Sequence, residues 1–155
     1  MRIEYINPFV DASYEILTEV LGSEVKRGEL YLKEDSTPIL GLGVIIGVTG
    51  AVSGRVLIDM NIDTAKSVAS QMNGEKITEF NELAKATISE LANLIVGRAV
   101  TKLHHLGFDF HISAPTILTG TNIEITTIQI EAVSVPLMLE EGKIEVNIAV
   151  KEVNN

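Results

Sequence analysis

The chain has 155 residues and a mass of 16.8 kDa, enough for one hydrophobic core and too few for two independent ones. Apolar residues make up 46% of it and charged residues 21%, which excludes a disordered chain, and the absence of cysteine excludes disulfides, thiolate metal sites and cysteine nucleophiles. A formal charge of −9, a pI near 4.8 and scattered basic residues argue against a nucleic acid or a membrane as partner.

The first predicted element is a helix with signals at both ends. Asn7 is a favourable N-cap, Pro8 is a favourable first helical residue, and Gly22 is a typical C-terminal stop. Strands are then expected over residues 25–32, 42–48 and 52–60, with a turn at Thr49-Gly50, followed by a helix over residues 64–72 that Asp63 caps and Asn73-Gly74 ends.

The longest periodic segment runs over residues 78–106 and predicts one long helix that ends at Gly107. At 100° per residue, one broad apolar face holds Ala84, Ile88, Leu91, Ala92, Ile95, Ala99, Leu103 and Leu106. The opposite arc holds Glu82, Ala86, Glu90, Asn93, Gly97, Thr101 and His104. The pattern is therefore typical of a helix with one face against a core and the other toward solvent.

The rest of the chain predicts strands over residues 123–131, 133–139 and 144–150, with a hairpin connection at 140–143 and an edge or bulge at Pro136. Both halves read as a helix that ends in Leu-Gly, at Gly22 and at Gly107, followed by strands and a hairpin. Neither half has enough apolar residues to stand alone. We therefore expect residues 1–155 to form one α+β domain with pseudo-duplicated halves, in which long helices pack on a largely antiparallel sheet.

Several familiar catalytic motifs fail on inspection. The glycines between Gly41 and Gly54 match neither dinucleotide-binding nor P-loop spacing, and no serine lies in a nucleophile elbow. His104 and His105 are adjacent, so they point about 100° apart on a helix, and no carboxylate stands at zinc-protease spacing from them or from His111. We therefore expect no metal or cofactor bound by this chain itself.

One pair of polar residues on the long helix stands out. Glu90 and Asn93 are three residues apart, which makes them neighbours on the helix surface. The spacing alone is weak, because Glu4/Asn7 and Glu152/Asn155 share it. The first alternative is set aside because Asn7 is the expected helix cap, and the second because it lies at the C-terminus.

The context of this pair leaves two interpretations open. Asparagine is unfavourable in mid-helix by up to about 0.7 kcal/mol, and the nearby Gly97 costs about 1 kcal/mol more, so these residues weaken the helix. Together with Ala86 and Ser89 they leave a shallow track along which another surface could approach. The alternative is an ordinary solvated helix face with a packing glycine. If the pair is functional, Glu90 and Asn93 should be exposed, with Ile88, Leu91 and Ile95 buried behind them.

The long helix with Glu90 and Asn93, together with the segment over residues 50–56, resembles the CheC/CheX/FliY family of phosphatases, which act on the phosphorylated chemotaxis response regulator CheY. The resemblance covers nearly the whole chain, from the helix start at Asn7 to the last strand. It implies that Glu90 and Asn93 form the catalytic pair. A second pair on the first helix, found in some members, is absent because its places hold Tyr5 and Pro8. Ala86 also departs from the family, which often has a small polar or acidic residue there.

The resemblance further implies a phosphatase that completes the active site of its substrate. The phosphorylated aspartate and a Mg²⁺ ion would belong to the response regulator, Asn93 would hold the attacking water, and Glu90 would pair with a lysine of the regulator. It also implies a homodimer. The alternative class is a non-enzymatic dimeric adaptor that binds a receiver domain and is related to flagellar switch proteins. The N-terminus lacks signal-peptide form and no apolar run is long enough for a membrane span, so we expect a cytoplasmic protein.

Overall fold

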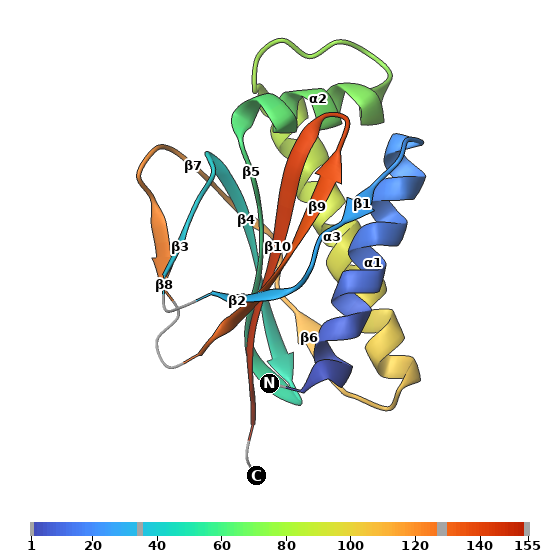
Figure 1. The fold of residues 1–155 in the computed structure, drawn as a ribbon, viewed down its shortest axis with the longest axis vertical. Helices are drawn as coiled ribbons and strands as arrows, with labels where there is room; N and C mark the ends of the chain where they lie inside the picture. The colour runs from blue at the N-terminus through green and yellow to red at the C-terminus, as the bar shows by residue number, and fades with distance from the viewer. Residues whose placement is uncertain (1, 34–35, 127–129, 154–155) are drawn as a thin grey trace.

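The computed structural model describes residues 2–33, 36–126 and 130–153, apart from the side chains of residues 36 and 37 (Figure 1). The helices in this part of the chain are α1 (Ile3–Leu21), α2 (Ile62–Asn73) and α3 (Glu82–His105). The strands are β1 (Lys26–Arg27), β2 (Tyr31–Lys33), β3 (Ser36–Pro38), β4 (Leu42–Gly50), β5 (Val52–Met60), β6 (Phe110–Ile112), β7 (Thr116–Thr119), β8 (Glu124–Thr126), β9 (Ala132–Leu139) and β10 (Gly142–Glu152).

Eight strands form one antiparallel sheet, and its order reflects a duplicated chain. The order is β1-β9-β10-β5-β4-β6, with β2 also on β9 and β7 also on β4, while β3 and β8 pair as a separate ribbon. Each strand of the first half has its counterpart at the mirrored place in the second half, and the two halves meet where β5 pairs with β10 along nine residues. The predicted α+β fold with duplicated halves is confirmed.

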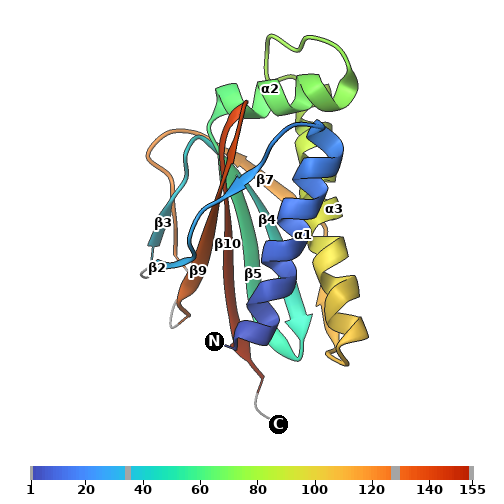
Figure 2. The same cartoon turned by 45° about the vertical axis from the view of Figure 1, so that its right-hand side comes forward.

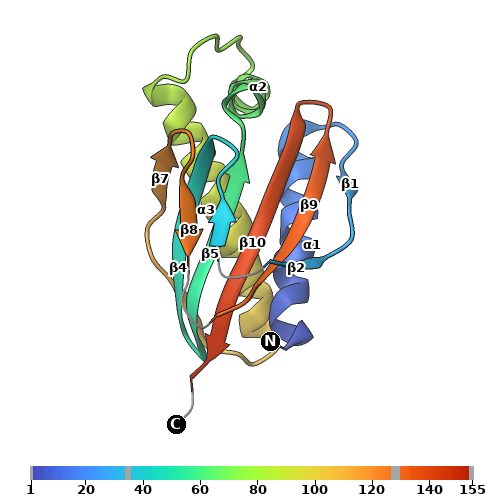
Figure 3. The same ribbon diagram turned by 60° about the vertical axis from the view of Figure 1, so that its left-hand side comes forward.

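The helices cover one face of this sheet. Figures 1 and 2 show α1 and α3 side by side against the sheet, with α2 across one end, and Figure 3 shows the β3–β8 ribbon on the other side. Ile144, Val146 and Ile148 alternate along β10 and are fully buried beneath the helices. The largest buried side chains between the layers are Ile6, Phe9, Leu17, Leu42, Ile46, Ile58, Met60, Ile88, Leu91, Ile95 and Phe110. None of the described helices is both long and apolar enough to cross a membrane.

The predicted start of the first helix is wrong. Helix α1 begins at Ile3, and Pro8 lies inside it. Tyr5 and Ile6 are only 4% and 2% exposed, so burial of these two side chains extends the helix past the proline. Proline has no amide hydrogen, so the carbonyl of Glu4 loses one helical hydrogen bond, which is tolerable this close to the N-terminus. Gly22 ends the helix with φ of +64°, as predicted.

The caps of the other helices also differ from the prediction. Asn61, and not Asp63, caps α2, because its Oδ1 accepts from the Thr64 amide at 2.7 Å. Asn81 caps α3 in the same way through the Ala84 amide at 2.9 Å, so this helix begins later than residue 78.

The longer strands are confirmed and the shorter ones are corrected. Residues 42–48, 52–60, 133–139 and 144–150 all lie in strands, whereas residues 25–32 form only β1 and β2, and β8 covers only part of 123–131. Residues 127–129 of that last prediction lie outside the described residues. Pro136 lies on β9 between the stretches that β1 and β2 cover, and its carbonyl accepts from the Gly28 amide at 2.8 Å. A proline is suited to this place because it has no amide to donate.

The sheet face away from the helices contains a buried polar cluster, which we define as Lys33, Asp59, Ser134, Glu145 and Asn147. Glu145 accepts hydrogen bonds from Lys33 at 2.7 Å and from the Tyr31 hydroxyl at 2.8 Å, and Ser134 donates to Asn147. Asp59 on β5 lies directly opposite Glu145 on the neighbouring strand β10 and is fully buried. Neither of its carboxylate oxygens has a hydrogen-bond partner in the described structure. Burial raises the pKa of the Asp59 carboxyl to about 7.

Candidate functional site

Helix α3 presents Glu90 and Asn93 on the side away from the core. Ile88, Leu91 and Ile95 are fully buried against the sheet and the neighbouring helices, as predicted. Glu90 is exposed, whereas Asn93 is half-buried and not fully exposed as expected, because it lies at the edge of the solvent-facing arc. The two residues follow each other by three positions in an unbroken helix, so their side chains leave the same surface.

Neither side chain is used by the fold. Within the described residues, Glu90 forms no ion pair and Asn93 forms no hydrogen bond. Other asparagines of this chain do have structural partners: Asn61 and Asn81 cap helices, and Asn147 donates to the Leu57 carbonyl at 3.1 Å. The Asn93 carboxamide therefore keeps its donor and its acceptor available for another molecule.

Two small residues lie in line with the pair along the solvent-facing side of α3. Ala86 is exposed one turn before Glu90, and Gly97 lies one turn after Asn93. A Cβ atom added to Gly97 would meet nothing within 4 Å. The glycine is therefore not required for packing within this chain, so the packing interpretation of Gly97 lacks support.

Two sets of contacts fix the position of α3, and the sequence alone did not reveal them. Asn73 at the end of α2 donates to the Thr87 hydroxyl at 2.8 Å, just before Glu90. Farther along, Arg98 contacts Glu19 at 2.6 Å and Lys102 contacts Glu15 at 2.9 Å, which ties α3 to α1. These are exposed or half-exposed contacts, so they orient the helix more than they stabilise the fold.

The rival Glu-x-x-Asn pairs have different surroundings. Glu4 and Asn7 both lie on α1, so the reason for setting this pair aside is wrong, because Asn7 is not a cap. Glu4, however, is ion-paired with Arg2 in the first turn of the helix. Glu152 lies at the end of β10 and also contacts Arg2, at 3.6 Å, and Asn155 lies outside the described residues.

The positions that match a second family pair on α1 are not available to a partner. Tyr5 is 4% exposed and packs edge-on against Phe108 and Phe110, and Pro8 is buried. Glu90 and Asn93 on α3 are therefore the pair that remains available to a partner.

The histidines do not gather into a metal site. The His104 ring lies 2.9 Å from the Phe110 carbonyl, and His111 lies beside Asp109 at 3.1 Å. Among the residues that the structure describes, no group of three or more histidine or carboxylate side chains could hold a metal ion.

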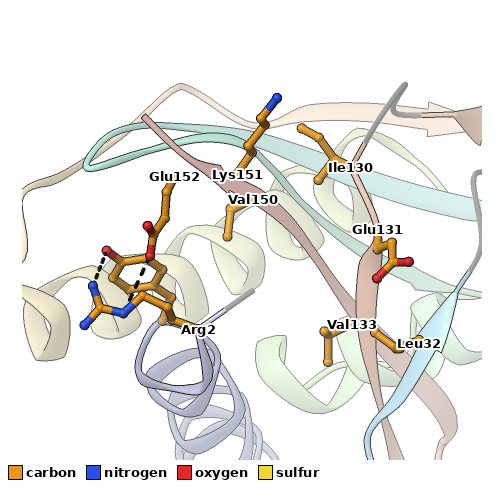
Figure 4. A pocket seen from close by; sticks show the side chains of 9 residues that line it. Arg2, Leu32, Ile130, Glu131, Val133, Val150, Lys151 and Glu152 are labelled. Atoms are coloured by element: carbon orange, nitrogen blue, oxygen red, sulfur yellow. Dashed lines mark hydrogen bonds and ion pairs between the residues drawn. The ribbon is translucent and has the colours of Figure 1, made fainter. Parts of the chain in front are cut away.

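A pocket near the N-terminus of α1 lies away from the Glu90/Asn93 pair. A pocket of about 770 Å³ opens where α1 begins beside the ends of β2, β9 and β10 (Figure 4). Arg2 reaches across it to the Tyr5 hydroxyl at 3.2 Å and to Glu152. Glu90 and Asn93 do not line this pocket. The pair lies on an exposed helix surface, which suits a macromolecular partner better than a small substrate.

Comparison with known proteins gives the family. A family model described as chemotaxis phosphatase CheX matches residues 42–138. The CheY-P phosphatase CheX of Thermotoga maritima is 32% identical over 126 residues, which cover 81% of each protein.

Solved structures agree with this match over almost the full length. A chain in the crystal structure of the CheX–CheY–BeF3–Mg²⁺ complex from Borrelia burgdorferi is 42% identical, with a TM-score of 0.85 over 97% of this chain and 100% of that one. A CheC-like superfamily protein from Shewanella is 25% identical, with a TM-score of 0.88 over 97% and 99%. On these grounds the chain belongs to the CheX family of chemotaxis phosphatases.

Proposed function

We propose that this chain is a CheY-P phosphatase that hydrolyses the aspartyl phosphate of a CheY-type response regulator by placing Glu90 and Asn93 over the regulator's phosphorylation site. The observation that carries this proposal is the Asn93 carboxamide, which lies in the middle of a long helix without a partner among the described residues. Membership of the CheX family and the CheY complex of the Borrelia relative support the choice of substrate.

The reaction needs little chemistry from this chain. Hydrolysis of an aspartyl phosphate requires a water in line with the scissile bond and positive charge near the phosphoryl oxygens. In this proposal a Mg²⁺ ion of the regulator supplies the charge, in keeping with the Mg²⁺ in the CheX–CheY complex from Borrelia. What remains for the chain is to bind the regulator and to hold the water.

Asn93 and Glu90 have different roles in this reaction. The Asn93 carboxamide can donate with its nitrogen and accept with its oxygen, so it can fix both the position and the orientation of a water molecule. Glu90 offers a carboxylate on an exposed helix surface, where a lysine of the regulator would form a charge-assisted hydrogen bond. Neither residue needs to act as a strong base, because most of the rate gain comes from positioning.

The test separates a catalyst from an adaptor. The protein is added at substoichiometric amounts to a phosphorylated CheY-type regulator with Mg²⁺, and the release of phosphate is followed over time. A catalyst releases many equivalents of phosphate per protein chain. An adaptor that merely binds the receiver domain leaves the rate unchanged or protects the phosphate, and that result would overturn the proposal.

Two further features belong to the same proposal. We expect a homodimer in which both Glu90/Asn93 sites remain accessible, since a regulator has to reach each of them. We also keep the cytoplasm as the compartment predicted from the sequence.

A further inference from the structure

Two exposed leucines flank the candidate catalytic pair on α3. Leu83 is 42% exposed and precedes Glu90 by seven residues, and Leu94 is 36% exposed and follows it by four. Spacings of four and seven residues return to the same side of a helix, so both leucines share the solvent-facing arc with Glu90. Each leucine thus places apolar surface in water beside a carboxylate that has no partner in the described structure.

Gly97 gives an independent reason to expect a partner on this surface. An interior glycine destabilises a helix relative to alanine. Gly97 has neither a positive φ nor any atom that an added Cβ would touch, so the fold gains nothing from it. A glycine here removes side-chain bulk one turn beyond Asn93, where another backbone could approach α3 closely.

We propose that Leu83, Leu94 and Gly97 form, around Glu90, the docking surface for the phosphorylated receiver domain, and that they set affinity for the regulator without taking part in the chemistry. This inference rests on the proposed function, because the surface is continuous with Glu90 and Asn93. The leucines bury against apolar groups of the regulator on either side of the pair, and Gly97 lets a segment of the regulator lie against the helix.

The proposal predicts a particular division of kinetic effects. A leucine that contacts the regulator away from the phosphoryl group binds the ground state and the transition state equally. Its removal therefore raises KM and leaves kcat unchanged, whereas removal of the water-positioning group lowers kcat. This difference separates docking residues from the catalytic pair.

The experiment uses the full-length chain and a CheY-type regulator that carries beryllofluoride and Mg²⁺ in place of the phosphoryl group, so that it can be bound and not hydrolysed. Leu83→Ser and Leu94→Ser should each weaken binding about tenfold, as expected for an apolar anchor at an interface. Turnover of the phosphorylated regulator should show the same rise in KM, with kcat within about twofold of wild type. The matched control is Leu106→Ser, which removes a leucine that is 61% exposed at the far end of α3 and should change neither value.

Gly97→Ala tests the close approach by a change that the fold accepts. The variant should unfold at a higher temperature than wild type, because alanine is the better helix former, and yet bind the unreactive regulator about fivefold or more weakly. A variant that is more stable and binds as well as wild type would show that no partner approaches Gly97.

The outcomes distinguish this inference from the proposed function. If the wild-type protein turns over and Asn93→Ala does not, but both leucine variants bind the regulator as tightly as wild type, the docking surface is wrong and the proposed function stands. Absence of turnover in the wild-type protein overturns the proposed function. The measured binding of each variant to the beryllofluoride-bound regulator still tests the docking surface in that case. A lower kcat in the leucine variants at unchanged KM would also contradict a docking role. Melting temperatures of all variants check that each of them is folded.

Discussion

At the scale of single residues, the clearest prediction concerns Asn93. Asn93→Ala should lower phosphatase turnover about 10²–10³-fold, by analogy with the loss of one preorganised polar group. Binding to the beryllofluoride-activated regulator should persist, because the amide adds little contact area. The melting temperature should stay the same or rise slightly, since alanine favours a helix. Stopped assays of phosphate release, a binding titration and a thermal melt measure the three quantities.

The chain offers a matched control for this variant. Asn7→Ala removes an exposed asparagine with the same Glu-x-x-Asn spacing on α1, and it should leave turnover unchanged. If Asn93→Ala keeps near wild-type turnover, Asn93 does not orient the water and the adaptor interpretation takes its place.

Glu90→Ala should affect both binding and rate. A charge-assisted hydrogen bond to a lysine contributes about 1.5–3 kcal/mol, so kcat/KM should fall roughly 10- to 100-fold, with a rise in KM. Glu79→Ala removes the same charge from an exposed residue before α3 and serves as the control for overall electrostatics. Equal effects of the two substitutions would mean that Glu90 acts only through net charge.

How far these residues could be predicted depended on the kind of signal. The pair Glu90 and Asn93 was visible because a polar, helix-weakening residue stood in a long periodic segment. The exposed Leu83 and Leu94 were not identified, because an exposed leucine and a buried one look alike in a helical pattern. Asn73 and Thr87 were also missed, since a contact between two helices leaves no mark in the local sequence.

At the scale of elements, the start of α3 should depend on its cap. Asn81→Ala removes the acceptor for the Ala84 amide and should lower the free energy of unfolding by about 1 kcal/mol, within a usual range of 0.5–2. Asn81→Ser keeps a capping oxygen and should retain most of the stability. Urea unfolding of the three proteins gives the comparison. If the alanine variant matches wild type, the cap contributes nothing to stability.

The polar side of the sheet predicts a dependence of stability on pH. The Asp59 carboxyl ionises near pH 4 in an unfolded chain and near pH 7 in the fold, because burial outweighs the attraction of Lys33 and Lys143, and Glu145 adds repulsion. Between these values the folded state holds a proton that the unfolded state has lost. The contribution of Asp59 to stability therefore falls as the pH rises from about 4 to 7 and stays low above that range.

Asp59→Asn should remove this decline. At about pH 8 the variant should be more stable than wild type by on the order of 1–3 kcal/mol, and near pH 4 the two should differ little. Chemical unfolding across the pH range measures the difference. Glu29→Gln neutralises an exposed carboxylate and should show no such gain. A wild-type advantage at high pH would mean that Asp59 is stabilised as a carboxylate.

The element boundaries show why sequence patterns were only partly sufficient. Asp63 and Asn61 are both good caps, and only the geometry shows that Asn61 reaches the Thr64 amide. Pro8 is typical of a helix start, but the burial of Tyr5 and Ile6 outweighed that preference. The long strands were predictable because their apolar or alternating patterns extend over seven or more residues, whereas β1 and β2 are held by pairing with β9.

At the scale of the whole molecule, the prediction concerns assembly. We expect the protein to sediment as a dimer that buries at least about 1,000–1,600 Å² in total, the range of specific interfaces. Both Glu90/Asn93 pairs should lie outside that interface, because each must reach a regulator. Sedimentation equilibrium at micromolar concentration measures the mass, and the double variant Glu90→Ala/Asn93→Ala should give the same result. A clean monomer, or a double variant that dissociates, would contradict this arrangement.

The fold class was predictable because the two halves repeat the same order of helix, strands and hairpin. The mirrored sheet order confirms the duplication, although no sequence pattern indicated which strands meet at the centre. Assignment of residues 1–155 to a single domain stays a prediction.

The central place of β10 has a consequence for protein synthesis. It is the last of the described strands along the chain, yet it lies between β5 and β9 and joins the two halves. Until β10 has been synthesised, one edge of β5 is therefore unpaired. Val56 and Ile58 of β5 then lack their neighbours Ile148 and Val146 on β10. A nascent chain in this state exposes an unpaired strand edge, and chaperones that bind such edges should matter most for this protein in the interval before β10 leaves the ribosome.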